Sequence, residues 1–401
     1  MLNEELVLPQ KLLVICENSN SLTEGYISIQ AQVMKSLGWD VSFLCCEGGG
    51  VGVKHIGGFS TVYTPCSNLI KPVTVSQRIK KFVRTYSYSN SELASSDEIV
   101  SWKNKISDIS PDIILVQFGT MAAKILPALI SFTGTWVVHF HGFDITERCG
   151  HWGYRRTLQH LLKVAPAVVG CSNFVVDRLT KYASSDNDRI YVVSPGYDET
   201  RYKYQRSEVI PSTTAIAKVV KFISVARLAE GKGHDITIRA LARLEIDWVL
   251  TIIGGGPQQS CLIDLSKELG IENQVHIVGA QTPEQIRHKL FESDVFVQSS
   301  RRAESGWIEG LGLSSLEAAA TGLPVIVSNS GGLGETCAHN ETGFVYPEGD
   351  LDQLEMALRR LCLDSTLRKK MGDAGANWVK KKYSSEVQGR KLDAIMRKLL
   401  M

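Results

Sequence analysis

Strand-like apolar runs alternate with helical stretches along both halves of the chain. Near the start, Lys11–Cys16 is mostly apolar, 27–37 has apolar residues at helical spacing, and 41–45 is a second short run. Runs of about four to eight apolar residues are typical of strands buried in parallel sheets. The alternation therefore predicts an α/β fold built from doubly wound, Rossmann-like sheets. Further strands are predicted at 112–117, 135–141, 221–226, 248–253, 275–278, 294–298 and 324–327.

A polar tract divides this pattern into two similar halves. Residues 207–214 contain Pro211 and few apolar positions, which indicates a linker. The last stretch, from Ser384 to Leu400, has apolar residues at helical spacing and predicts a terminal helix. The predicted organisation is a first domain at 1–206, a linker at 207–217, a second domain at 218–383 and a C-terminal helix at 384–401.

Composition fits an ordinary globular protein of this size. The 401 residues are 44% apolar and 21% charged, so two folded domains are expected and extended disorder is not. The formal net charge of +2, together with the lack of zinc-finger or RNA-recognition spacing, gives no case for nucleic-acid binding.

Targeting and metal-binding patterns are also missing from the sequence. The first ten residues include Glu4 and Glu5 and have no secretory pattern, and the apolar runs are too short for a bilayer, so a cytoplasmic location is expected. The nine cysteines are scattered without a Cys-x-x-Cys pair. The nine histidines form no metal-binding spacing, so neither a structural metal nor a cofactor is predicted.

Glu309 and Glu317 flank a glycine turn that leads into a predicted helix. Residues 295–300 before the turn are expected to be a buried strand, and 313–321 a helix that ends at Gly322. A helix N-terminus offers unpaired N–H groups and partial positive charge, so it can bind a phosphate without a metal ion. Glu309 could then accept hydrogen bonds from a sugar, and Glu317 could hold a ribose diol. The backbone expected to meet the phosphate is that of Gly310, Leu311, Gly312 and Leu313.

The residues around this turn resemble those of a known family. The run 309–322 continues through Pro324-Val325-Ile326, Gly331-Gly332 and Thr342-Gly343, and resembles the retaining GT-B glycosyltransferases of family four. A second block, 221–233, looks like the strand of that family that is followed by an Arg and a Lys five residues apart. The resemblance implies two Rossmann-like domains facing a central cleft, with the donor site in the second domain, the acceptor site in the first and a C-terminal helix that returns to the first.

Arg227 and Lys232 match the family's pair that grips the donor diphosphate. Physical reasoning agrees, because an Arg leaving a strand and a Lys opening the next helix can converge on one pyrophosphate. Gly255, in the glycine run 254–256 after an apolar strand, is expected to let backbone approach the donor, although such a run is also an ordinary turn.

His141 is the predicted functional residue of the first domain. It lies in a His-Gly-Phe-Asp turn at a strand end, resembling the family's His-Gly-x-Asp turn. A neutral imidazole there could bind the transferred sugar or the acceptor, and Asp144 could either orient it or cap the residues that follow. His139 is interpreted as a strand histidine satisfied by backbone. Gly25 lies where the family has paired glycines, and either an acceptor contact or a plain helix start is possible.

The segment from Val75 to Tyr86 is the candidate membrane-contacting region. Its apolar residues fall at helical spacing while Arg78, Lys80, Lys81 and Arg84 supply positive charge. Such a helix could lie on an anionic membrane, which would suggest peripheral attachment and a lipid-linked acceptor. An amphipathic helix packed on its own domain explains the pattern equally well.

The resemblance implies a retaining glycosyltransferase that acts without a metal ion. Its expected donor is a UDP-sugar, with GDP-mannose next, and its expected acceptor is a glycan hydroxyl, either lipid-linked or on a polysaccharide. His141, Arg227, Lys232 and Glu309 are the predicted catalytic residues. No carboxylate pair identifies a nucleophile, so a front-face mechanism is favoured over double displacement. The alternatives are a GT-B nucleotide-sugar epimerase, a phosphorylase and a non-catalytic sugar-nucleotide binding protein.

Overall fold

The computed structural model describes residues 9–17, 25–46, 54–56, 59–64, 93–183, 188–204 and 219–401, with backbone alone at 54–56 and 59–64. The predicted linker at 207–217 and the candidate membrane segment Val75 to Tyr86 lie outside these residues. The chain forms two compact units, one of residues 1–195 with 388–401 and the other of 196–387.

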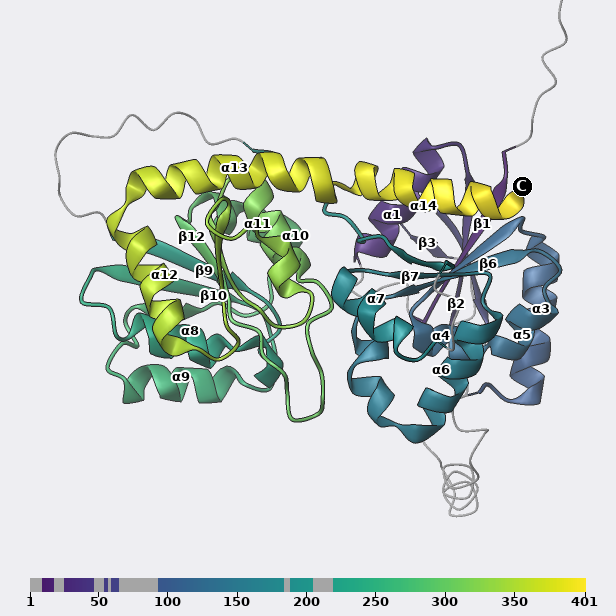
Figure 1. The fold of residues 1–401 in the computed structure, drawn as a ribbon, viewed down its shortest axis with the longest axis horizontal. Helices are drawn as coiled ribbons and strands as arrows, with labels where there is room; N and C mark the ends of the chain where they lie inside the picture. The colour runs from purple at the N-terminus through teal and green to yellow at the C-terminus, as the bar shows by residue number, and fades with distance from the viewer. Residues whose placement is uncertain are drawn as a thin grey trace, which may run out of the picture. The chain divides into compact units, whose positions relative to one another are not determined.

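In its described part, the first unit is built on an eight-stranded sheet of order β3-β4-β2-β1-β5-β6-β7-β8, parallel except for the β3–β4 pair. Helix α1 covers one face together with α14, and α3 to α7 cover the other (Figure 1). The strands are β1 Lys11–Cys16, β2 Asp40–Cys46, β3 Lys54–Ile56, β4 Phe59–Thr64, β5 Ile113–Gln117, β6 Thr135–Phe140, β7 Ala167–Gly170 and β8 Ile190–Val192. The helices are α1 Gly25–Ser36, α3 Ser96–Ile109, α4 Gly119–Lys124, α5 Leu126–Ser131, α6 Trp152–Val164 and α7 Asn173–Thr180, with short 3-10 turns η3 Phe143–Ile145 and η4 Glu147–Gly150.

The second unit has a six-stranded, fully parallel sheet within the described residues, of order β11-β10-β9-β12-β13-β14. Helices α8, α9 and α12 gather on one face, and α10, α11 and α13 on the other (Figure 1). The strands are β9 Val220–Val225, β10 Trp248–Ile253, β11 Val275–Ile277, β12 Val295–Gln298, β13 Val325–Ser328 and β14 Gly343–Tyr346. The helices are η5 Glu230–Lys232, α8 His234–Leu241, α9 Gln259–Glu268, α10 Pro283–Phe291, α11 Leu313–Ala320, η6 Leu333–Thr336, α12 Leu351–Leu363 and α13 Ser365–Tyr383. The last helix, α14 Ser385–Leu400, belongs from Gln388 onward to the first unit.

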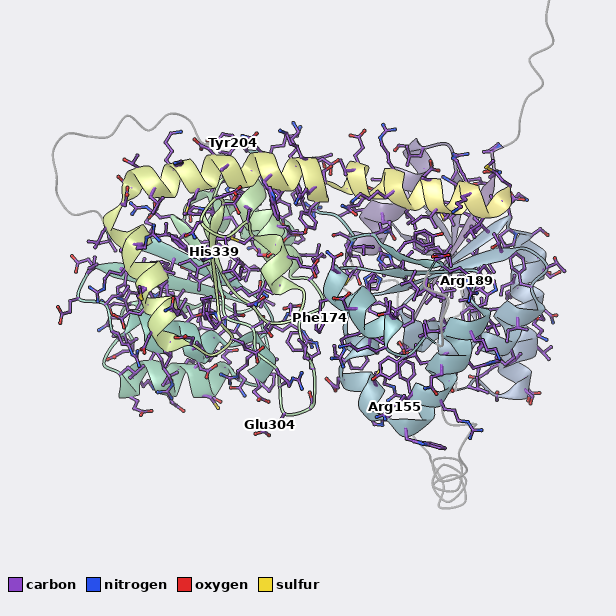
Figure 2. All side chains as sticks on the ribbon, in the orientation of Figure 1. Arg155, Phe174, Arg189, Tyr204, Glu304 and His339 are labelled. Carbon is purple, nitrogen blue, oxygen red and sulfur yellow. The ribbon has the colours of Figure 1, made fainter. Side chains whose placement is uncertain are left out.

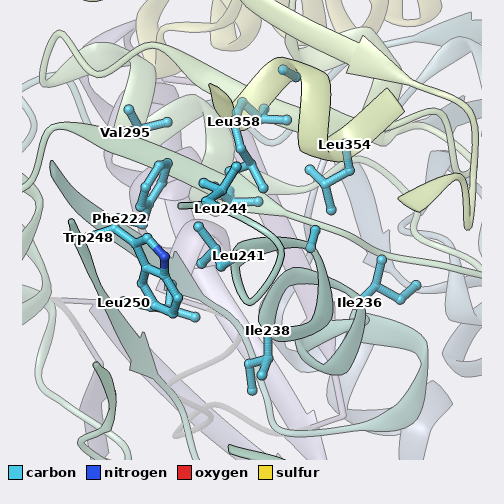
Figure 3. Close-up of a cluster of buried hydrophobic side chains, with 14 of the residues drawn as sticks. Phe222, Ile236, Ile238, Leu241, Leu244, Trp248, Leu250, Val295, Leu354 and Leu358 are labelled. Carbon is cyan, nitrogen blue, oxygen red and sulfur yellow. The ribbon is translucent and has the colours of Figure 1, made fainter. Parts of the chain in front are cut away.

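The core of the second unit lies between its sheet and the α8 face. Phe222 and Leu250 of the strands are fully buried against Leu241 of α8 and Leu358 of α12 (Figure 3). These side chains come from the apolar runs that predicted strands and from helical stripes, so burial of both patterns in one layer holds the parallel strands in place. Because its strands are held in this way, the sheet can carry polar side chains at fixed positions at the strand ends.

The boundary between the units lies earlier than the sequence predicted. Residues 196–204 group with the second unit, whereas the prediction placed them in the first domain. The physical reason is a backbone pairing in which Tyr197 donates to the carbonyl of Tyr383 at 3.0 Å and accepts from the N–H of Ser385 at 3.0 Å. Contacts between segments so distant in sequence leave no mark on local patterns.

The C-terminal helix packs on the first unit, as its amphipathic pattern and the family resemblance implied. Leu392 and Met396 of α14 are fully buried in the cluster that contains Ile27 and Met34 of α1. This packing explains why 388–401 belongs to the first unit although it is farthest from it in sequence.

We expect Leu392→Ala to destabilise the first unit by about 2–5 kcal/mol, because it removes buried methyl groups and leaves a cavity. Amide hydrogen exchange in β1 reports on that unit alone, and its protection should fall by the corresponding factor. Lys391→Ala, at the neighbouring exposed position, is the control. Equal protection in both variants would contradict the packing of α14.

Candidate active site

Several segments that the sequence predicted to bind ligand follow neighbouring strands of the second sheet. The strands β10, β9, β12 and β13 lie side by side in this order and run parallel, so their carboxyl ends meet at one edge of the sheet. Open α/β sheets bind their ligands beyond this edge. The strands β12 and β13 end in polar residues, Gln298 and Ser328, and small residues follow β9 and β10 at Ala226 and Gly254.

Lys232 and Glu309 meet at this edge. The Lys232 ammonium lies 2.5 Å from Oε2 of Glu309, and both side chains are largely buried, with exposed fractions of 14% and 10%. Lys232 ends the turn η5 after β9, and Gly233 follows with a φ of +64°. A side chain at Gly233 would collide with the carbonyl of Ser299, so glycine allows β12 and the Lys232 turn to pack closely.

Glu309 is held by more than this ion pair. Its Oε2 accepts hydrogen bonds from Nε2 of Gln298 at 2.9 Å and from the hydroxyl of Ser300 at 3.2 Å. Its backbone carbonyl accepts the N–H of Gly332 at 3.0 Å. Three side-chain donors on one carboxylate oxygen stabilise the charge in a buried position, as a buried carboxylate requires. Gln298 and Ser300 were not predicted, although their position at a strand end marked them as polar residues in a buried run.

The glycine turn delivers the chain to the N-terminus of α11, as the sequence predicted. Gly312 precedes the helix with a φ of +96°, a conformation that favours glycine. Because Gly312 has no side chain, it cannot accept from the N–H groups of the first turn, and its carbonyl accepts the hydroxyl of Ser315 at 2.7 Å. Gly310 and Leu311 of the turn are buried, and Leu313 begins the helix.

Two glycines of the run after β10 are required by backbone packing. Gly254 and Gly256 have positive φ, and added side chains would collide with the carbonyls of Ala226 and Leu228. Gly255 accepts the N–H of Leu228 at 2.9 Å, and a side chain there would meet only ordinary contact. The run therefore lets β10 pack against the residues around Arg227, whose own side chain is exposed.

Glu317 lies about one turn inside α11. Its side chain is close to Asp198, Arg201 and Tyr202, in the first residues of the second unit. Burial raises the pKa of Glu317 to about 8, opposed by the positive charge of Arg201 and by a hydrogen bond from Tyr202, and reinforced by Asp198. The side chain is half-buried by its exposed area, so water reaches part of it. Glu317 thus holds its proton more tightly than an ordinary glutamate.

In the first unit, His141 follows β6 and lies among aromatic rings. Its ring centroid is 5.0 Å from that of Tyr26, 4.7 Å from Phe118 and 4.3 Å from His139. Burial, and secondarily the neighbouring His139, hold the pKa of His141 well below its ordinary value, so its imidazole is neutral. Its Nε2 lies 2.8 Å from Oε1 of Gln117.

A glutamine relay fixes this imidazole. Nε2 of Gln117 donates to Oε1 of Gln30 at 2.8 Å, which leaves Oε1 of Gln117 as an acceptor. His141 therefore carries its proton on Nε2, and Nδ1 keeps its lone pair. The sequence prediction missed Gln30 and Gln117. The available signal was Gln117, a polar residue that ends the buried apolar strand β5.

Asp144 binds backbone N–H groups of residues that precede it, and not those of the residues that follow, as one predicted alternative had it. Its carboxylate accepts the backbone N–H of Gly119 at 2.8 Å, of Gly142 at 2.9 Å and of His141 at 3.1 Å. Burial raises the pKa of Asp144 to about 6, although these N–H groups oppose the rise. His139 has the predicted backbone partner at one ring nitrogen, since its Nε2 lies 2.9 Å from the carbonyl of Val193, whereas its buried Nδ1 has no hydrogen-bond partner among the described residues.

The start of α4 next to this turn is strained. Phe118 has a φ of +71°, unusual for a bulky residue, and its N–H donates to the carbonyl of His139 at 2.8 Å. Such strain persists where surrounding contacts over-determine the backbone, and it commonly marks functional sites. Gly25 begins α1 and has open space around it, and the loop before it lies outside the described residues.

Within the described ranges, His, Cys, Asp and Glu side chains form no group of three or more that could hold a metal ion. In the same ranges, every helix is too short or too polar to cross a membrane.

Two family profiles match the chain, one on each unit. Residues 24–201 match the family described as Glycosyltransferase Family 4, and residues 206–378 match Glycosyl transferases group 1. A GDP-mannose-dependent alpha-(1-6)-phosphatidylinositol monomannoside mannosyltransferase of Mycobacterium tuberculosis is 32% identical over 51% of this chain and 54% of its own. The amylovoran biosynthesis glycosyltransferase of Erwinia amylovora is 30% identical over 62% of this chain and 61% of its own. The chain thus spans little more than half the length of these relatives.

The fold extends further than the sequence similarity. The sucrose-phosphate synthase of Thermosynechococcus elongatus superposes over 97% of this chain and 99% of its own, with a TM-score of 0.78 at 18% identity. At this identity the likeness shows a shared fold. The similarity covers both units, so the whole described architecture has a known counterpart.

Proposed function

We propose, from the premise that this chain belongs to the glycosyl transferases group 1 family and has the GT-B fold, that it is a retaining glycosyltransferase. It would move a sugar from a nucleoside-diphosphate sugar to a hydroxyl of a glycan, either lipid-linked or part of a polysaccharide. The observation that carries the proposal is the buried Lys232–Glu309 pair, set between the end of β12 and the uncapped N-terminus of α11.

The proposed donor site uses the charges at this edge of the sheet. Lys232 and the exposed Arg227 would bind the diphosphate, the Lys as a point charge and the Arg as a fork. The α11 N-terminus, from Gly310 to Leu313, would supply further N–H donors. Glu309 would accept a hydrogen bond from the transferred sugar, and Glu317 would hold the ribose diol.

The proposed reaction takes place on one face of the sugar. The bond from the anomeric carbon to the diphosphate oxygen breaks as the bond to the acceptor oxygen forms, and the acceptor proton passes to the leaving diphosphate. Lys232, Arg227 and the helix N-terminus would stabilise the negative charge that develops there. These groups neutralise the diphosphate themselves, so we propose that no metal ion is required.

The first unit would hold the acceptor. His141 is neutral and keeps a lone pair on Nδ1, so it would accept a hydrogen bond from a hydroxyl of the sugar or of the acceptor. Asp144 would act through the backbone of the turn, and Gly25 would lie at the acceptor-side loop. The mycobacterial relative is named for a phosphatidylinositol-linked acceptor, which supports a lipid-linked glycan. Peripheral attachment to the inner face of the membrane would follow from such an acceptor.

The donor base is proposed from the relatives. UDP-sugars were the first expectation from the family resemblance, with GDP-mannose next. The mycobacterial relative, at 32% identity, is named as GDP-mannose-dependent, and we therefore propose GDP-mannose ahead of UDP-sugars as the donor.

A turnover assay tests the function. The protein is incubated with GDP-mannose or UDP-sugars, and released nucleoside diphosphate is measured with and without a lipid-linked glycan acceptor. Release that depends on acceptor, with a product of the same anomeric configuration as the donor, supports the proposal. Donor epimerisation without acceptor would assign an epimerase, and tight binding without any turnover would assign a non-catalytic binding protein.

We expect donor affinity to rise with pH. The pKa of Glu317 is raised from 4.5 to about 8, so below this value the free enzyme holds a proton that a carboxylate accepting two ribose hydroxyls must release. A donor that binds the carboxylate form therefore gains affinity as pH rises between about 5 and 8. Titration calorimetry with GDP checks the slope. The Glu317→Gln variant should bind GDP more weakly, and its affinity should no longer change with pH. If the affinity of this variant changes with pH as in the wild type, the role of Glu317 is contradicted.

A further inference from the structure

Trp307 lies against the Lys232 ammonium. Lys232 Nζ is 4.6 Å from the centroid of the Trp307 ring, while the same nitrogen contacts Glu309 at 2.5 Å. Trp307 belongs to the loop between β12 and α11, on which Figure 2 shows Glu304. The ammonium therefore has an aromatic face on one side and a carboxylate on another.

The backbone opposite the ring is shaped to admit it. At Gly231, an added side chain would place its first carbon 2.4 Å from Cε3 of Trp307, closer than carbon atoms approach. Gly231 has no positive φ, so the ring and not the backbone conformation demands glycine there. The Lys232 turn and the Trp307 ring are thus fitted to each other.

The loop that carries Trp307 is held in place at several points. The carbonyl of Trp307 accepts the N–H of Ala303 at 2.9 Å, and Gly306 donates to the carbonyl of Ala303 at 2.9 Å. At the start of the loop, Arg301 forms an ion pair with Asp235 of α8 at 2.8 Å. The first two contacts fix the loop internally, and the Arg301–Asp235 pair ties its start to the helix that follows the Lys232 turn.

We propose that Trp307 is a positioning residue that holds Lys232 in the geometry for binding the donor diphosphate. The inference rests on the proposed function, because it assigns Lys232 to that diphosphate. An aromatic face attracts a cation placed over it and restricts a flexible lysine side chain. The ammonium has three N–H groups. One donates to Glu309, and the Trp307 ring covers one side of the nitrogen. In the proposal, the remaining side binds the donor diphosphate.

The role predicts a loss that is specific to the diphosphate. Trp307→Leu keeps an apolar side chain but removes the aromatic face, and it should weaken binding of GDP or UDP about tenfold. Binding of guanosine or uridine, which lack phosphate, should stay unchanged. Trp307→Phe keeps a ring and should recover most of the lost affinity. Equilibrium dialysis with radiolabelled ligands measures each ratio of diphosphate to nucleoside affinity.

Trp378→Leu is the matched control. Trp378 carries a comparable contact on α13, with Lys382 Nζ 4.9 Å from its ring, and takes no part in the proposed donor site. Its replacement should leave both affinities at the wild-type level. If the ratio of diphosphate to nucleoside affinity in Trp307→Leu equals that of the wild type, the role of Trp307 is wrong, while the proposed function is unaffected. Failure of the wild type to bind either diphosphate would overturn the proposed function and the inference with it.

Gly231→Ala provides a second route that does not depend on the stability of Trp307→Leu. The added methyl must displace the Trp307 ring, so this variant should also weaken diphosphate binding about tenfold. Combining it with Trp307→Phe, whose smaller ring leaves room, should reduce its cost. The same cost in both backgrounds would show that the ring does not connect Gly231 to the ligand, and would contradict the proposal.

Discussion

Replacing Lys232 by alanine should lower sugar transfer by about a hundred- to a thousandfold, the usual cost of removing one group that stabilises developing negative charge. The fold should survive, because Glu309 keeps hydrogen bonds from Gln298 and Ser300 after the ammonium is gone. The measurement is kcat and donor KM with the preferred donor, together with an unfolding curve.

A second lysine offers the matched control for this change. Lys289 also pairs with a glutamate, Glu292, at 2.8 Å, but on an exposed face of α10. Lys289→Ala should leave transfer unchanged, because an exposed pair contributes little and lies outside the proposed site. Near-wild-type transfer in Lys232→Ala would remove Lys232 from the donor site.

Replacing Glu309 by glutamine should separate donor recognition from diphosphate binding. Transfer should fall by about a hundredfold or more, since the negative acceptor for the sugar hydroxyl is lost. Free GDP or UDP should bind more tightly, by roughly three- to tenfold. Removing the Glu309 carboxylate frees Lys232 from its ion pair, and it also removes a negative charge that repels the diphosphate. Calorimetry with the free diphosphate and a transfer assay measure the two effects.

In Glu309→Gln, sugar transfer should fall while the affinity for the free diphosphate rises. Glutamine keeps an oxygen that can accept from Gln298, so a general collapse of the site is not expected. Glu292→Gln, at the exposed residue that follows α10, is the control and should alter neither quantity. Weaker binding of the free diphosphate in Glu309→Gln would show that Glu309 supports the phosphate site and does not compete for Lys232.

The fold was accessible from the sequence because its strands are buried on both faces. The runs that predicted β1, β9, β10 and β13 are short and mostly apolar, with few polar interruptions such as Lys221 and Thr251, which is typical of strands in a parallel sheet. The strand that the pattern missed in the second unit, β14, is Gly343–Tyr346; it begins with a glycine, which leaves an apolar run of only the three residues 344–346. A run so short and bounded by a glycine gives little periodicity to detect.

The site was accessible in part, because strand ends and glycine turns are visible in sequence. These features indicated where a ligand could bind, and the family resemblance singled out Lys232, Glu309 and His141; the structure brings Lys232 and Glu309 into contact. Contacts between distant segments were not accessible, such as Gln117 beside His141 or Trp307 beside Lys232. These pairs depend on how loops pack, which no local spacing records.

Equilibrium binding of the donor tests the central claim most directly. Wild type and Arg227→Ala are heated with GDP-mannose and with UDP-sugars, with and without a chelator. One donor class at a hundredfold excess over Kd should stabilise the wild type by about 2.7 kcal/mol whether or not chelator is present. That stabilisation should be largely lost in Arg227→Ala. No response of the wild type to any sugar nucleotide would contradict the account.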